Sequence, residues 1–140
     1  RTCMNWYVDQ TIAGPVTCQL MLSPLILHQT RPKRSGRVRI VSLKFSIVLE
    51  VDLKCSNLYN LNLSNCNSLE ILKLDCPRLA NLQLLACTML QEDELKSALS
   101  FCGALEILNV HSCPQINTLD FGRLQAVCPT LKRIQSSLIA

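Results

Sequence analysis

A repeated pattern of cysteine and leucine is the feature that most limits how this 140-residue chain can fold. The sequence from Cys55 reads CSNLYNLNLSNC, that from Cys76 reads CPRLANLQLLAC, and that from Cys102 reads CGALEILNVHSC. A shorter copy from Cys128 reads CPTLKRI, and the starting cysteines are 21, 26 and 26 residues apart. Self-similarity at such a period indicates one structural unit that is stacked several times.

The spacing of the leucines matches the leucine-rich-repeat template, in which a short strand alternates inward leucines with outward residues. A half-length copy, CNSLEILKLDC from Cys66, lies between the first two full copies, and a weaker one, with Val48, Val51 and Leu53, lies before the first. Because a coil must go out and come back, we pair each half-turn with its neighbour. The predicted fold class is α/β, a leucine-rich-repeat solenoid with short parallel strands on the concave face and helices or extended segments on the convex face. The 21-residue coils should return as extended chain and the 26-residue coils as helices.

Two return helices are predicted. For the first, Thr88 and Gln91 have the spacing of a capping box, and Gly103 suits the C-terminal cap. A second helix should begin after Asp120 and end before Pro129. The residues expected to face the core are Leu95, Ala98, Leu99 and Cys102 in the first helix, and Phe121, Leu124 and Val127 in the second.

The repeats divide the chain into two parts. Residues 39–140 form the repeat array, with about four coils, whereas residues 1–38 fit the template in no register and are assigned to no domain. Pairs such as Gly14-Pro15 and Ser23-Pro24 favour irregular structure there, or a cap over the open end of the solenoid. The chain starts with Arg1, which reads as a fragment or a processed product.

Charge and hydropathy argue against nucleic acid and membrane as partners. The net charge is +4, and five of the fourteen basic residues lie in the run RPKRSGRVR at positions 31–39 instead of spreading over the repeats. That run is either a nuclear-import or anionic-surface segment or a solvated loop. The apolar stretch from Leu20 to Leu27 is too short for a membrane helix, which needs about 20 residues.

Nine cysteines raise the question of metal or disulfide chemistry. Their number is odd and no secretion signal is visible, so we expect reduced thiols in the cytoplasm or nucleus. Zinc sites usually bring ligands as close pairs, but no two cysteines here are nearer than ten residues. We therefore interpret them as structural thiols at the bends of the coils and expect no metal.

Catalysis is not predicted either. Strand alternation points His111 outward. No serine or cysteine nucleophile stands beside it in the pattern of a catalytic triad, so a surface or partner-contacting histidine is favoured. No acid–base pair, nucleophile frame or phosphate-binding loop stands out in the sequence. We expect no enzymatic activity and no cofactor.

What remains is the outward face of the parallel strands, which is rich in amides and carries scattered apolar groups. Amides offer adaptable hydrogen bonds and apolar groups offer anchors for a partner protein. Ordinary solvent-exposed surface is the alternative. The candidate partner-binding residues are Asn60, Asn62, Ser64, Asn81, Gln83, Leu85, Ile107, Asn109, His111, Arg133 and Gln135, and Tyr59 lies beside them.

The cysteine-containing frame and its 26-residue spacing resemble the repeats of plant F-box/LRR proteins. CPRLANLQLLAC, CGALEILNVHSCPQI and AVCPTLKRI carry the resemblance, which covers about Val48 to Ile134 and leaves residues 1–38 outside it. In that family a repeat array recognises a protein substrate, and an F-box docks on the Skp1 and cullin parts of an SCF-type ubiquitin ligase.

The resemblance therefore implies a substrate-recognition module for ubiquitin-dependent protein degradation. Nothing between Arg1 and Leu53 has the leucine-proline start and helical pattern of an F-box, so Skp1 and cullin would bind only through an F-box absent from this chain. A repeat segment of a non-ligase scaffold or of a plant immune receptor is the alternative, and an upstream F-box would distinguish the two.

Overall fold

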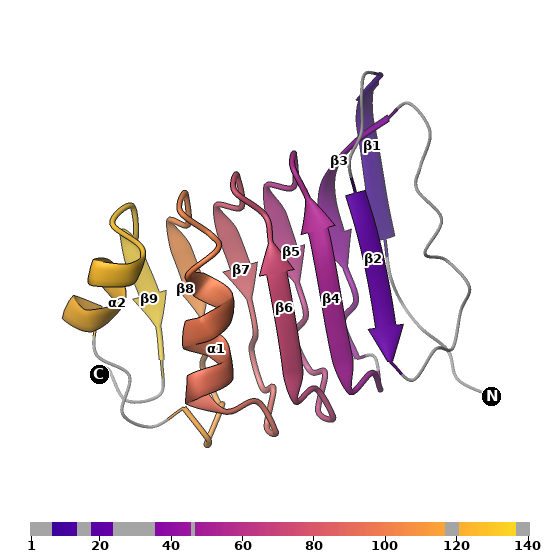
Figure 1. The fold of residues 1–140 in the computed structure, drawn as a ribbon. Coiled ribbons are helices and arrows are strands. Elements are labelled where there is room, and N and C mark those ends of the chain that lie inside the picture. The colour runs from indigo at the N-terminus through magenta and orange to yellow at the C-terminus, as the bar shows by residue number, and fades with distance from the viewer. Residues whose placement is uncertain (1–6, 14–17, 24–35, 46, 117–120, 137–140) are drawn as a thin grey trace.

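The computed structural model describes residues 7–13, 18–23, 36–45, 47–116 and 121–136, with side chains described from Arg39 onward. The coils stack one after another along a single axis, from the N-terminal strands at one end to the C-terminal helix at the other (Figure 1). This is the predicted solenoid, an α/β fold with short parallel strands in a ladder-like sheet. Among the described residues, no helix is long and apolar enough to cross a membrane.

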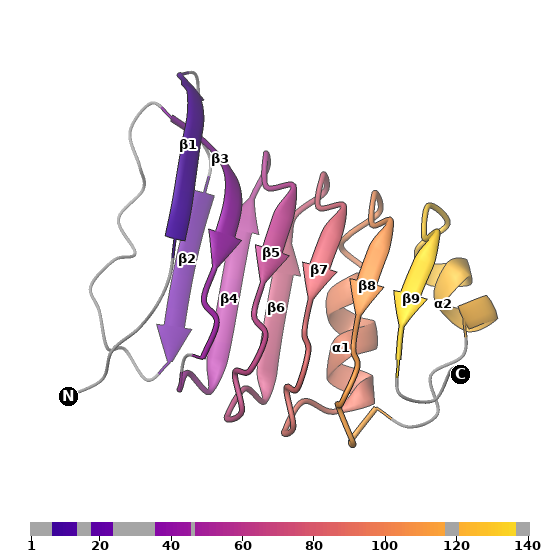
Figure 2. The same cartoon turned by 180° about the vertical axis from the view of Figure 1, so that it is seen from behind.

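One layer of the solenoid is a six-stranded sheet, called here the front sheet (Figure 2). Its repeat strands are parallel and in register, so that Leu61 lies beside Leu82, Leu82 beside Leu108 and Leu108 beside Ile134. The predicted strand positions are therefore confirmed. The strands from the repeats are β3 (Gly36–Ser42), β5 (Asn60–Asn62), β7 (Asn81–Gln83), β8 (Ile107–Asn109) and β9 (Arg133–Gln135).

The opposite layer changes from strand to helix along the solenoid. The two short coils return through the parallel strands β4 (Glu50–Cys55) and β6 (Ile71–Asp75). The two long coils return through α1 (Glu92–Leu99) and α2 (Phe121–Val127). Five extra residues allow a helical turn where the shorter coil permits only an extended strand, which confirms the predicted link between coil length and return structure.

Two antiparallel strands cover the first coil. β1 (Tyr7–Ala13) pairs with β3 at the edge of the front sheet, and β2 (Cys18–Ser23) pairs with β4 at the edge of the three-stranded back sheet. The interpretation of this segment as irregular is therefore wrong for these residues, while the alternative of a cap agrees with their position. Local punctuation by glycine and proline could not reveal strands whose partners lie 20 to 40 residues away.

Leucines from every coil fill the space between the two layers. Leu61, Leu82 and Leu108, at equivalent positions of β5, β7 and β8, are fully buried. At about 25 cal/mol per Å² of apolar surface removed from water, such burial is the main driving force for stacking the coils. The core is aliphatic because each inward position must accept the same kind of side chain above and below it.

The helix boundaries differ from the predicted ones. Gln91 is the N-cap residue of α1 but makes no side-chain cap bond, and the Thr88 hydroxyl donates 3.4 Å to the Asn67 carbonyl of the preceding coil. The predicted capping box is therefore wrong, because the Thr88 hydroxyl bonds to the preceding coil and not to the start of α1. The helix ends at Leu99, and its C-cap residue is Ser100 in right-handed conformation, so Gly103 is not the C-terminal cap.

The inward faces of the helices are mostly as predicted. Leu95, Ala98, Leu99 and Cys102 are all buried, as expected for the first helix. In α2 Leu124 is buried and Phe121 packs partly against the core, but Val127 is 39% exposed, contrary to the prediction. The inward position one turn after Leu124 is taken by Cys128, which is fully buried, so Val127 lies beside that face.

Candidate functional site

The front sheet presents two parallel columns of outward side chains. The strand register stacks Asn60, Asn81, Ile107 and Arg133 in one column. It stacks Asn62, Gln83, Asn109 and Gln135 in the other. Because side chains alternate across a strand, both columns point away from the leucine core.

Hydrogen bonds hold the amides of this face in place. The Asn109 side-chain amide donates to Gln83 Oε1 at 3.0 Å, and the Gln83 amide donates to Asn81 Oδ1 at 2.7 Å. The side-chain oxygen of Asn62 accepts the backbone N–H of Ser64 at 2.9 Å, and that of Asn109 accepts the backbone N–H of His111 at 3.0 Å. These bonds fix the side-chain conformations before any partner arrives, which lowers the entropy cost of binding.

The structure brings together ten of the eleven candidate residues as half-buried or exposed side chains on this face or at its corner. Ser64 is the exception, because it is 6% exposed and counts as buried. It lies where the chain bends out of the sheet, and its backbone N–H is bound to Asn62. Strand alternation does not hold through this bend, so the outward placement of Ser64 is wrong.

His111 has a hydroxyl neighbour, since its Nδ1 lies 2.9 Å from Ser112 Oγ. Both side chains are exposed. Within the part of the chain that the structure describes, no carboxylate hydrogen-bonds to the ring, so the pair lacks the third group that orients a catalytic base. The geometry is that of a surface histidine beside a turn.

The repeat cysteines form two stacked columns of buried thiols, as the sequence predicted. Cys55, Cys76, Cys102 and Cys128 precede the front strands, whereas Cys66, Cys87 and Cys113 follow them. In the described ranges no group of three metal-binding side chains is close enough to hold an ion. In the second column each thiol donates to a carbonyl of a neighbouring coil, from Cys66 to Leu43 at 3.1 Å, from Cys87 to Leu63 at 3.1 Å and from Cys113 to Leu84 at 3.0 Å.

Burial keeps these thiols protonated. Desolvation, with smaller contributions from the neighbouring cysteines, raises the pKa of Cys87 to about 12, and desolvation likewise raises the pKa of Cys102 to about 12. The pKa of Cys76 is raised well above its usual range for the same reason. A thiol is nucleophilic only as thiolate, so these cysteines act as small apolar groups that also donate a hydrogen bond between coils.

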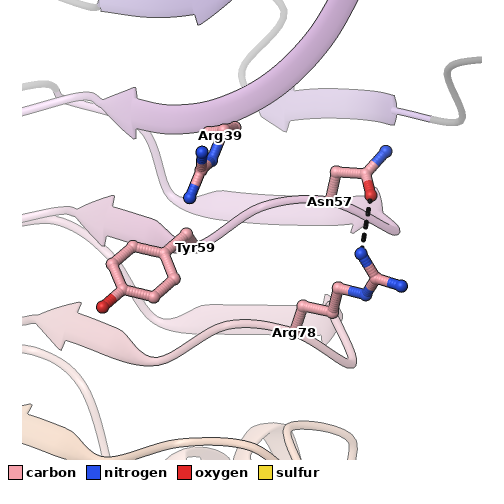
Figure 3. Close-up of a pocket in the computed structure, with 4 residues that line it drawn as sticks. All are labelled: Arg39, Asn57, Tyr59 and Arg78. Carbon is pink, nitrogen blue, oxygen red and sulfur yellow. Dashed lines mark hydrogen bonds between the residues drawn. The ribbon is translucent and has the colours of Figure 1, made fainter. Parts of the chain in front are cut away.

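The sequence-based reasoning missed a pocket of about 180 Å³ at the corner where the first front strands begin (Figure 3). It is lined by Arg39, Asn57, Tyr59 and Arg78, which come from two successive coils and from β3. The Arg39 guanidinium carbon lies 5.7 Å from the centroid of the Tyr59 ring. Arg78 Nη1 donates to Asn57 Oδ1 at 3.4 Å.

A signal for this pocket was present in the sequence. Arg39 ends the basic run and Tyr59 lies beside the outward face, but their proximity depends on the register between β3 and β5.

No protein-family model matches the chain, and no solved structure matches it either. The functional argument therefore rests on the residues of this chain and on their geometry.

Proposed function

We propose that this chain is a protein–protein interaction module that binds a protein partner through the outward face of the front sheet. One observation carries the proposal. The two outward columns form a continuous row of side chains across β5, β7 and β8, on strands that are locked in register, and side-chain hydrogen bonds join Asn81, Gln83 and Asn109 of β7 and β8. Such a surface is rigid and extended, as recognition of another folded protein requires.

The chemistry of the face supports this proposal. Ile107 and Leu85 are half-buried apolar side chains among amides, an arrangement in which a partner can bury an anchor and still pair its polar groups. The cysteines of the described repeats are buried, and His111 lies on open surface. A binding role without catalysis or cofactor fits these residues better than an enzymatic one.

A finer proposal concerns the protein to which this module belongs. The repeats resemble those at the C-terminal end of plant F-box/LRR-repeat protein 15, and the structure agrees with the repeat register on which that resemblance depends. We propose a role as part of the substrate-recognition repeats of an SCF-type ubiquitin ligase, in the cytoplasm or nucleus. The bound protein would then be the substrate, while Skp1 and cullin would require an F-box.

Affinity capture from a plant cell lysate tests the interaction role. The 140-residue chain is used as bait beside the variant Ile107→Ala, and bound proteins are identified by mass spectrometry. The matched control is Ile71→Ala, because Ile71 is an exposed isoleucine of β6 in the opposite layer. A partner that Ile107→Ala loses and Ile71→Ala retains supports the front face. Equal retention by both variants would contradict it.

The ligase role is tested separately with the full-length gene product. Recovery of Skp1 together with the captured partner supports the ligase assignment. Recovery of the partner without Skp1 would instead support the alternative of a scaffold or an immune receptor.

A further inference from the structure

A further column of residues runs along the corner where the chain enters the front sheet. Each coil contributes one residue to it. Backbone hydrogen bonds run from Tyr59 to Arg39 at 2.8 Å, from Ala80 to Tyr59 at 2.9 Å, and onward to Glu106 and Lys132. Residues at this corner are therefore held one above another at the spacing of the coils. The residue that follows Tyr59 in this column, Ala80, is small and buried.

The two ends of this column differ in charge. At the C-terminal end Lys132 lies 3.8 Å from Glu106, so one cation is neutralised by the residue of the preceding coil. At the N-terminal end Arg39 and Arg78 line the same pocket, and within the described ranges neither has a carboxylate within 4 Å. Two arginine side chains thus line one pocket without a negative partner in the described chain.

The other two lining residues each contact one of the arginines. Arg78 donates to the carbonyl oxygen of Asn57, which leaves the Asn57 amide nitrogen as a further donor. The Tyr59 ring supports the Arg39 guanidinium from its face. Figure 3 shows Arg39 beside the Tyr59 ring and the hydrogen-bonded Asn57 and Arg78 nearby. Planar guanidinium groups match the geometry of a carboxylate in particular.

We infer that the pocket formed by Arg39, Asn57, Tyr59 and Arg78 binds a carboxylate side chain from an acidic segment of the partner protein. The inference rests on the proposed function, since the pocket opens at the corner that continues into the front sheet. It adds the chemical character of the partner, which is acidic where it meets the first two coils. Charge attraction of this kind speeds association and fixes the register of the bound chain.

Fluorescence anisotropy tests the inference with a fluorescein-labelled hexaglutamate peptide and a hexaglutamine peptide of the same length. The intact 140-residue chain should bind hexaglutamate and not hexaglutamine, and the affinity should fall as salt is raised. Arg39→Gln and Arg78→Gln should each weaken binding about fivefold, as expected for exposed charge pairs, and the double variant about twentyfold.

The control is Lys132→Gln, which removes one positive charge from the same column at its other end. Binding that falls equally in this control would show a general effect of net charge and overturn the inference. Hexaglutamate affinity that is unchanged in the Arg39 and Arg78 variants would also overturn it, and circular dichroism establishes that each variant is folded. If inorganic phosphate binds more tightly than hexaglutamate, the pocket prefers phosphate to a carboxylate, and the inference is overturned.

Failure of the acidic-segment inference can be distinguished from failure of the proposed function. A captured partner that depends on Ile107 but has no dependence on Arg39 or Arg78 would leave the interaction module standing and remove the acidic-segment inference. A captured partner that Ile107→Ala retains, together with loss of hexaglutamate binding in the arginine variants, would support the arginine pocket and contradict the front face.

Discussion

Four residues adopt positive φ at equivalent corners of the solenoid, just after the front strands β3, β5, β7 and β8. They are Phe45, Asn65, Ala86 and Ser112, with φ between 60° and 64°. The corner needs this conformation because the backbone N–H there is directed at the next coil, as in the 2.9 Å bond from Ala86 to the His111 carbonyl. Asparagine tolerates the left-handed region, but alanine does so only at a cost in free energy.

Replacement of Ala86 by glycine should therefore stabilise the protein. Relief of the left-handed conformation, at about 1 to 2 kcal/mol, exceeds the extra backbone entropy of glycine in the unfolded chain, at about 0.5 to 1 kcal/mol. We expect the free energy of unfolding in urea to rise by about 0.5 to 1 kcal/mol. The control Ala126→Gly, in the exposed part of α2, should lower it by about 1 kcal/mol. Destabilisation by Ala86→Gly would contradict the strain argument.

The cysteines predict a dependence of stability on alkaline pH. Burial raises the pKa of Cys87 from 9.0 to about 12 in the folded chain, while the unfolded thiol keeps its ordinary value. Because the folded state holds the proton more tightly, the stabilisation is complete below pH 9 and is lost as the pH rises toward 12. Above about pH 9, the slope of unfolding free energy against pH should approach −1.4 kcal/mol per unit for each such thiol.

Urea unfolding at several pH values from 8 to 10.5 measures this slope. Cys87→Ala should make it shallower, whatever the variant loses in stability at pH 8. An identical slope in the variant and the parent would show that Cys87 is not protected from ionisation in the folded chain.

At the scale of the elements, the periodic leucines predicted the strands and helices of the repeats. They could not predict contacts between side chains of different coils. The strands β5 to β9 and the core face of α1 follow from the positions of Leu82, Leu108 and Leu95. Thr88 was misassigned because a hydroxyl with a local capping pattern bonds across to Asn67. The arginine pocket was missed because its side chains come from different coils.

A leucine of the front strands is expected to contribute a large share of the stability. Leu82 lies between Leu61 and Leu108 in register, and it is fully buried. Leu82→Ala should lower the free energy of unfolding by about 2 to 5 kcal/mol, since neighbouring coils can close the cavity only in part. The neighbouring Gln83→Ala removes an outward side chain and serves as the control. A loss below about 0.5 kcal/mol at Leu82 would refute its core role.

The change from strand to helix in the back layer leaves β6 at the edge of its sheet, and Glu94 of α1 covers that edge. Its Oε2 accepts the Leu72 backbone N–H at 2.9 Å. Glu94→Ala removes the acceptor of a partly buried donor, so unfolding free energy should fall by about 1 to 3 kcal/mol. Asp93→Ala, an exposed acid in the same helical turn, should change it by less. Equal losses of unfolding free energy in Glu94→Ala and Asp93→Ala would show that both acids act through the helix dipole and not through the bond to Leu72.

At the scale of the whole molecule, stability in a solenoid is a sum of coils and of the interfaces between neighbours. An end coil has only one such interface, and its strands present unpaired backbone groups at the sheet edge. β1 and β2 pair with β3 and β4 at the N-terminal end, where they cover the edges of both sheets at once (Figure 2). The segment that fits no repeat thus acts on the repeats as their cap.

Removal of residues 1–35 should therefore change both stability and association. The shortened chain keeps every repeat but exposes the outer edges of β3 and β4, which are free to pair with the same edges of a second copy. Light scattering should show dimers or larger species that increase with concentration, and thermal unfolding should be broader and begin at lower temperature. A peptide of residues 1–35, added in trans, should shift the population back to monomer, because it supplies the two missing strands. A shortened chain that remains monomeric and unfolds as sharply as the parent would show that the repeats stabilise their own first coil.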